Sequence, residues 1–218
     1  MPAYTNKSRV SLLAMAGPLA AAAQRQRAEP AVLEAARAVE HAARTLELEL
    51  GGRRAAGQRL SAEAAQAHAI EASLDRRIAA LHRTLDGLAG LGFGEAEALS
   101  DVLFPEGLSA LIGPKGRAQV PGYRMLAATL DERRASPAAA RLEPAIRALH
   151  DDLVAFCEAL ADKDEAHDDR RSTAARAAEA AEALQRALLT LDRTIELLSG
   201  GPRSDGYLDW AAAARGLG

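Results

Sequence analysis

Residues 81–90 read LHRTLDGLAG, and residues 191–200 read LDRTIELLSG. The two stretches lie 110 residues apart and share Leu, Arg, Thr, Leu and Gly at matched places. Two unrelated amphipathic helices often share an apolar stripe, but shared polar residues at matched places argue for common descent. The match therefore predicts a tandem internal duplication.

The apolar residues of the second half form one stripe along a helix, with steps that alternate between four and three residues. They are Leu142, Ile146, Leu149, Leu153, Phe156, Leu160, Leu184, Leu188, Leu191, Ile195 and Leu198. The positions 110 residues earlier are Val32, Ala36, Val39, Ala43, Leu46, Leu50, Leu74, Ile78, Leu81, Leu85 and Leu88. All of these are apolar too, as a duplicated helical unit requires.

The similarity also extends upstream of each stripe. LAAAAQRQRAEPA at 19–31 aligns with LAATLDERRASPA at 126–138, with a separation of 107 residues. About three residues therefore changed in length at the junction. Because the second stretch lies in the middle of the chain, we expect its N-terminal counterpart to be a helix of the folded protein.

This expectation bears on residues 7–24, KSRVSLLAMAGPLAAAAQ, which have the basic start, apolar run and Ala-rich end of a secretory signal peptide. The duplication favours a retained helix and a cytoplasmic protein. A periplasmic or secreted protein is the alternative if residues 1–23 are a signal peptide.

The composition favours an all-α protein. Aromatic residues make up 3% of the chain, whereas Ala, Leu, Arg and Glu, which favour helices, are abundant. The formal net charge of −3 gives no general attraction to nucleic acid or to an anionic membrane. The sequence contains no uninterrupted apolar run of about 18 residues, so we expect no membrane span.

The turn-forming residues divide the chain into four parts. We expect a first helical repeat at 1–90, a connector rich in Gly and Pro at 91–122, a second helical repeat at 123–200, and a tail with a short helix at 201–218. Pro30 and Pro137 are expected to begin helices, and Gly90 and Gly200 to end them.

Each long helical segment could be straight or folded back on itself. No Gly or Pro occurs from Ala145 to Ser199, which favours a long-helix antiparallel coiled coil or bundle in which Leu46 packs near Leu191. Such a straight segment would be about 80 Å long. The first copy contains GGRRAAG at 51–57, which favours the alternative, a compact up-down four-helix bundle of two duplicated hairpins with Leu46 near Leu81.

Enzyme and metal signatures are missing from the sequence. Di-iron bundles need Glu-x-x-His motifs, but the chain offers only His68-x-x-Glu71, Asp164-x-x-His167 and His82-x-x-x-Asp86. The single cysteine, Cys157, follows Phe156 at an apolar position and is expected in the core. The sequence therefore indicates no catalytic residue, no metal site and no cofactor.

Three groups of residues are candidates for binding. Lys115, Arg117 and Arg124 lie among turn-forming residues and could meet an anion, although a solvated turn is the simpler interpretation. The apolar residues of the connector, Leu103, Phe104, Leu108 and Leu111, are expected to fold onto the helices or else to form a docking site, with Phe104 as its aromatic anchor.

Tyr207 and Trp210 lie three residues apart on one face of a short helix in the tail. They could anchor a partner or dock on the chain's own helices. With no sign of chemistry, the sequence favours a non-enzymatic structural or adaptor protein that binds a partner or a second copy of itself. A helical bundle that binds a small ligand or a metal is the alternative, and reversible lipid association through Ala/Leu faces is weaker still because those faces lack Trp, Phe and Lys.

Overall fold

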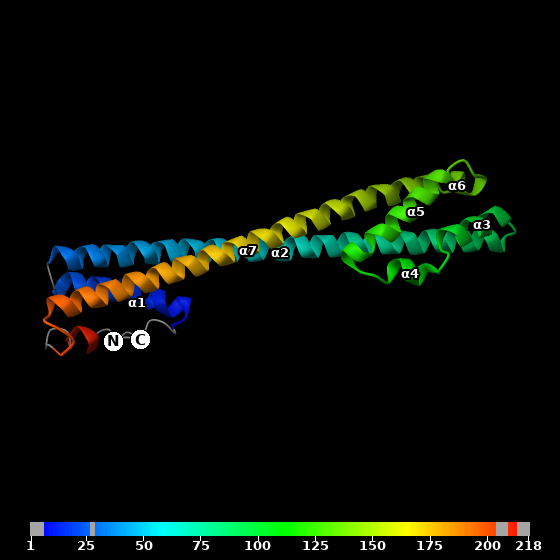
Figure 1. Ribbon diagram of the computed structural model, residues 1–218. Coiled ribbons are helices and arrows are strands. Elements are labelled where there is room, and N and C mark those ends of the chain that lie inside the picture. Colours follow the sequence, from blue (N-terminus) through cyan, green and yellow to red (C-terminus); the bar gives the residue numbers. More distant parts are fainter. Residues whose placement is uncertain (1–6, 27–28, 204–208, 213–218) are drawn as a thin grey trace. The chain divides into compact units, whose positions relative to one another are not determined.

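The structure is a computed structural model, and it describes residues 7–26, 29–203 and 209–212 (Figure 1). The described residues form helices and turns and contain no strand, so the all-α prediction is confirmed. The helices, in chain order, are α1 (Arg9–Gln26), α2 (Pro30–Gly90), α3 (Gly94–Leu103), α4 (Leu108–Ile112), the 3₁₀ turn η1 (Gly116–Ala118), α5 (Val120–Glu132), α6 (Pro137–Arg141) and α7 (Glu143–Leu198). No described helix is both long and apolar enough to cross a membrane.

The chain has two compact units, which are described separately. Unit 1 consists of Met1–Gly57 with Asp168–Gly218, and unit 2 consists of Gln58–His167. Each unit therefore contains part of α2 and part of α7, together with shorter helices. The units do not coincide with the two repeats expected from the sequence, because each unit combines half of one repeat with half of the other.

The glycines at 51–57 do not interrupt α2, which is one helix from Pro30 to Gly90. A Cβ atom added to Gly51 or Gly52 would meet nothing within 4 Å, so both positions face open space. These glycines lower the stability of the helix, because glycine loses more backbone entropy on folding than other residues. The packing of the apolar stripe stabilises the helix by more than this loss. The hairpin that these glycines favoured is therefore wrong for α2.

The second long segment is divided near its start, where α6 ends at Arg141 and α7 begins at Glu143. Pro144 explains the division, because a proline lacks the N–H group and its ring would clash with the carbonyl of Ala140 in a continuous helix. The matched position of the first copy is Glu34, and α2 accordingly continues through it. Ser136 caps α6, since its side chain accepts a hydrogen bond from the Ala139 N–H at 3.2 Å.

The two long helices end in the same way. Gly92, after α2, and Gly200 and Gly201, after α7, have positive φ angles of 89°, 87° and 111°. The Phe93 N–H donates to the Leu88 carbonyl at 3.1 Å, and the Gly201 N–H donates to the Glu196 carbonyl at 2.9 Å. Such bonds satisfy the last carbonyls of a helix, and glycine adopts the required left-handed conformation without strain.

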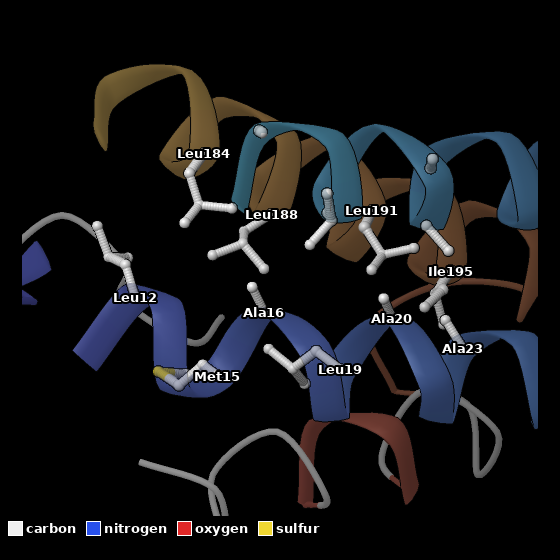
Figure 2. Packing of buried hydrophobic residues seen from close by; sticks show 14 of the residues in the cluster. Leu12, Met15, Ala16, Leu19, Ala20, Ala23, Leu184, Leu188, Leu191 and Ile195 are labelled. Atoms are coloured by element: carbon white, nitrogen blue, oxygen red, sulfur yellow. The ribbon is translucent and has the colours of Figure 1, made fainter. Parts of the chain in front are cut away.

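The core of unit 1 contains the apolar face of α1, the first part of α2 and the last part of α7 (Figure 2). In the view of Figure 2, Ala16 and Ala20 of α1 point toward Leu188, Leu191 and Ile195 of α7. Leu46 belongs to the same cluster as Leu191, whereas Leu81 belongs to the core of unit 2.

The core of unit 2 is formed by the last part of α2, by α3, α5 and α6, and by the first part of α7. Phe156 and Tyr123 are both fully buried, and their ring centroids lie 6.2 Å apart. Leu103 and Phe104 are buried in this core, with Leu108 and Leu111 packed against it. The apolar connector residues thus fold onto the helices.

Several positions matched by the sequence comparison have matching burial. Leu46 and Phe156 are both 0% exposed, as are Leu74 and Leu184. The upstream alignment behaves in the same way, because Leu19 and Leu126 are both buried, as are Ala23 and Leu130. A duplication predicts this pattern, although equal burial alone does not establish common descent.

Candidate functional site

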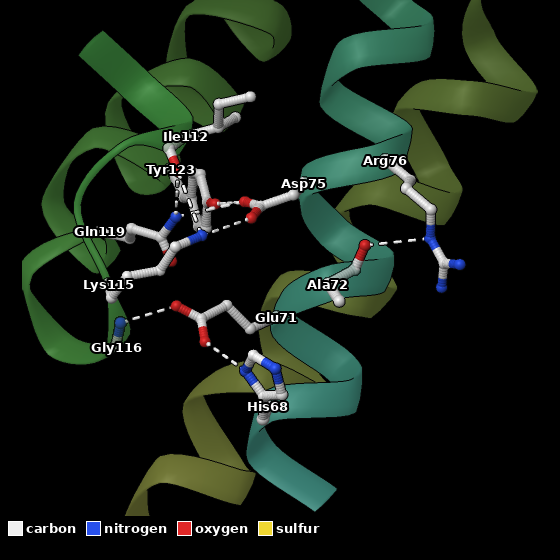
Figure 3. A network of polar contacts seen from close by, with 10 residues as sticks. All are labelled: His68, Glu71, Ala72, Asp75, Arg76, Ile112, Lys115, Gly116, Gln119 and Tyr123. Atoms are coloured by element: carbon white, nitrogen blue, oxygen red, sulfur yellow. Dashed lines mark hydrogen bonds and ion pairs between the residues drawn. The ribbon is translucent and has the colours of Figure 1, made fainter. Parts of the chain in front are cut away.

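A network of polar side chains joins α2 to the connector in unit 2 (Figure 3). The Asp75 carboxylate lies at its centre. Its Oδ1 atom accepts hydrogen bonds from the Tyr123 hydroxyl and, at 3.2 Å, from Gln119 Nε2. Its Oδ2 atom accepts from Lys115 Nζ at 3.0 Å. Three donors from the connector and α5 therefore converge on one carboxylate of α2.

Glu71, one helical turn before Asp75, extends the network. Its Oε1 atom accepts a hydrogen bond from the Gly116 N–H at 2.8 Å, and Oε2 lies 3.4 Å from His68 Nδ1. Glu71 is buried, and a buried carboxylate is tolerated when donors satisfy it. Gly116 has a φ of 60°, so the backbone turns there in the left-handed conformation that glycine favours.

Two donors of the network, Lys115 and Tyr123, have raised pKa values. The hydrogen bond to Asp75 raises the pKa of the Lys115 ammonium group above its usual value. Burial, and then the hydrogen bond to Asp75, strongly raise the pKa of the Tyr123 hydroxyl, so the phenol stays neutral and donates. The three donors hold the connector and α5 against α2, and we call this arrangement the clamp around Asp75.

In the described part of unit 1, three matched positions of this network carry apolar side chains. The positions that match Glu71, Gln119 and Tyr123 are occupied by Ala181, Leu12 and Ala16, which are buried among apolar side chains. Gln119 in unit 2 retains one buried atom, Oε1, without a hydrogen-bond partner.

The structure separates the three cations that the sequence placed together as an anion site. Lys115 pairs with Asp75 and lines a cavity of about 270 Å³ with His68 and Lys163. Arg117 and Arg124 line a different cavity, of about 240 Å³, whose wall includes Cys157 and Leu160. Arg117 also pairs with Asp164, and Arg124 Nη2 lies 3.9 Å from Cys157 Sγ. The half-buried Cys157 thus lies at the edge of the core.

Of the two aromatic residues of the tail, Tyr207 lies outside the described residues. Trp210 is 0% exposed and belongs to the core of unit 1. Its indole Nε1 donates a hydrogen bond to Asp192 Oδ1 at 3.0 Å. This position corresponds to docking on the chain's own helices, the second of the two interpretations of the tail.

Phe104, the aromatic candidate of the connector, is also largely buried. Its ring packs edge-on against the His82 ring, with 4.7 Å between the centroids. His82 Nδ1 lies 2.9 Å from Asp86 Oδ2. Among the described residues, no group of three or more His, Cys, Asp or Glu side chains is arranged to hold a metal ion.

Several exposed apolar side chains of unit 2 lie at or near the contact of α3 with α6, an area that the sequence analysis did not single out. Leu91, Phe93 and Val102 are 77%, 43% and 46% exposed there. Figure 1 shows α3 beside α6, as their contacts require. We call this area the end surface and define it by Leu91, Phe93, Glu95, Val102, Arg133 and Arg141.

Two cavities open on the end surface. One, of about 370 Å³, lies between Glu95, Leu99 and Val102 of α3 and Arg133 and Ser136 of the segment before α6. The other, of about 220 Å³, is lined by Phe93 and Ala96 on one side and by Pro137 and Arg141 on the other. The Arg141 guanidinium lies over the Phe93 ring, 4.8 Å from its centroid. The end surface can therefore receive apolar groups beside fixed charges.

The sequence contained a signal for this surface in GLGFG at 90–94, where two large apolar residues stand in a turn between glycines. We compared the chain with models of known protein families, with curated proteins and with solved structures, and none of them matched.

Proposed function

We propose that this protein is a non-enzymatic structural or adaptor protein that acts through protein–protein contact at the end surface. The observation that carries the proposal is the exposure of Leu91, Phe93 and Val102 beside two cavities. Exposed apolar side chains beside cavities and charged residues are typical of interaction sites on otherwise polar surfaces. The clamp around Asp75 supports the proposal, because it fixes part of the connector on α2 within the same unit.

We also propose that the chain arose by duplication and that its long helices pair antiparallel, as in a coiled coil or bundle. Matched burial of Leu46 with Phe156, and of Leu74 with Leu184, supports this. The helix ends support it further. The segment after α2 forms α3, which packs on α5, and the segment after α7 places Trp210 in the core that contains α1. In this proposal, the helix that follows the long helix of each copy packs against the short first helix of the other copy.

A second candidate function is the binding of a small anion in the cavity of Arg117 and Arg124. The specific observation is that two guanidinium groups line one cavity of about 240 Å³ with an apolar wall. Titration of the protein with inorganic phosphate, followed by calorimetry, tests this candidate. Binding that is lost in Arg124→Ala and kept in Arg133→Ala would support it, and no heat of binding would contradict it.

A photo-crosslinking experiment tests the main proposal in the cells that make the protein. Leu91 is replaced by p-benzoylphenylalanine, which reacts with whatever lies on the end surface. Val154 is the matched control position, because it is 58% exposed in the same unit but lies on α7. We expect a discrete protein adduct from position 91 that disappears in Phe93→Asp and is not formed from position 154. No specific adduct from position 91 would contradict the proposal.

The cytoplasmic location expected from the sequence is likewise a proposal. It is supported by the burial of Leu12, Met15 and Leu19 of α1 in the core of unit 1, where removal of the helix would expose that core.

A further inference from the structure

We infer that the occupant of the end surface is a second copy of this chain, bound about a two-fold axis. This inference rests on the proposed interaction role of the end surface and names the partner. A two-fold interface uses the same patch on both copies, so the patch has to be complementary to itself. The end surface has the apolar groups, the cavities and the charges that such a patch needs.

The charges of the end surface are divided by element. α3 carries Glu95 and Glu97 in its first turn, whereas Arg133 and Arg141 lie on the α5–α6 side of the same groove. A two-fold axis between the two sides places α3 of one copy opposite the arginines of the other. Opposite charges then meet at both symmetry-related places, and like charges do not.

These charges are available for a partner. Glu95 and Arg133 line one cavity, yet no ion pair joins them, and neither forms one with any other described residue. By contrast, the neighbouring Arg134 is already paired with Glu143. In the dimer, Glu95 of each copy pairs with Arg133 of the other copy, so two equivalent ion pairs form.

The apolar residues fit the same arrangement. Leu91 is 77% exposed and lies two residues from Phe93, and in the dimer we place its side chain in the cavity beside Phe93 of the other copy. Apolar groups of this kind at the centre of a patch supply most of the binding energy of an interface, and the surrounding charges fix its orientation. Lipid association is disfavoured, because Glu95 and Glu97 would face anionic headgroups.

Sedimentation equilibrium of the purified full chain, at concentrations up to about 1 mM, tests the inference. We expect a reversible monomer–dimer equilibrium. Phe93→Asp and Leu91→Asp should each raise the dissociation constant at least about tenfold, because each places a charge at the centre of the interface. Val154→Asp is the control and should leave the constant unchanged. All of these side chains are exposed, so circular dichroism should show that each variant folds.

A charge reversal tests the symmetry itself. Glu95→Arg alone and Arg133→Glu alone should both weaken the dimer, and the double variant should restore it, since the two positions face each other across the axis. A chain that is monomeric at every concentration would overturn the inference. A dissociation constant that is unchanged in Phe93→Asp would overturn the inference as well. So would the formation of oligomers larger than a dimer.

The crosslinks from position 91 separate this inference from the proposed function. An adduct with the same chain supports both. An adduct with a different protein only overturns the inference and leaves the proposed function in place. The absence of any adduct overturns both.

Discussion

Trp210 and Asp192 form a buried hydrogen-bonded pair in unit 1, with 3.0 Å between the indole Nε1 and Oδ1 of the carboxylate. The two side chains are 0% and 1% exposed. The pair holds the short helix that contains Trp210 against α7, at a distance of 18 residues along the chain.

We expect Trp210→Phe to destabilise unit 1 by about 1–3 kcal/mol, because the buried Asp192 carboxylate loses a donor and the smaller ring leaves space. Thermal unfolding followed by circular dichroism measures the effect. Asp209→Asn, an exposed neighbour, is the control and should change the stability by less than about 0.5 kcal/mol. Equal stabilities of the two variants would contradict the buried position of Trp210.

Leu46 and Leu48 differ in exposure although they are almost adjacent in α2. Leu46 is 0% exposed and Leu48 is 76% exposed. Leu46→Ala should cost about 2–5 kcal/mol of unfolding free energy, and Leu48→Ala less than about 0.5 kcal/mol. Urea unfolding monitored by the fluorescence of the single Trp210, which lies in the same core, measures both. Similar costs at the two positions would show that the helix is rotated from the orientation described.

The ion pair of Arg134 and Glu143 predicts an acid-dependent loss of stability. The hydrogen bond from Arg134 lowers the pKa of the Glu143 carboxyl below its usual 4.5. The folded state therefore favours the ionised form, and the stabilisation is present above pH 4.5 and lost as the pH falls below that value.

Glu143→Gln should accordingly lower the stability near neutral pH, and this deficit should shrink as the pH falls below 4.5, as measured by thermal unfolding in low salt. Both side chains are partly exposed, so added salt should reduce the difference. Glu106→Gln, an exposed acid with no resolved ion pair, is the control. A deficit in Glu143→Gln that grows as the pH falls would contradict the sign.

Gly51 and Gly52 lie inside α2 with open space where a side chain would be. Replacing each by alanine should therefore raise the stability by about 0.5–1 kcal/mol, because the unfolded chain loses freedom and the helix gains a better helix former. Gly92→Ala is the contrasting variant, since its φ of 89° strains any residue with a Cβ atom. Destabilisation by Gly51→Ala and Gly52→Ala, measured by thermal unfolding, would indicate a turn at these residues.

The apolar stripe predicted the helices and much of the core, because side chains such as Leu74 and Leu184 recur on one face of a helix whatever lies between them. The sequence could also have predicted the break between α6 and α7 at Leu142, because Pro144 cannot lie inside a continuous helix that begins at Pro137. The stripe did not show which halves would pack together, because both the straight and the folded arrangement bury the same residues.

The binding surfaces were less predictable. Asp75 follows Leu74 of the stripe, and nothing in the sequence distinguishes it from a carboxylate on the protein surface. Tyr123 and Gln119 reach Asp75 only because of the path that the connector takes. Arg117 and Lys115 are two residues apart, yet the 3₁₀ turn directs them to different cavities. Phe93 and Leu91 were interpreted as turn residues, and their exposure depends on how α3 meets α6.

The central claim is that unit 1 combines the first part of α2 with the last part of α7, and a crosslinking measurement tests it most directly. Glu49 Oε2 and Arg176 Nε lie 3.1 Å apart in this unit. In a Cys157→Ser background, we expect cysteines at positions 49 and 176 to be joined rapidly within one chain by a short bismaleimide. Cysteines at positions 49 and 77, which only a folded-back α2 brings together, should not be joined. Rapid crosslinking of 49 to 77, without crosslinking of 49 to 176, would contradict the claim.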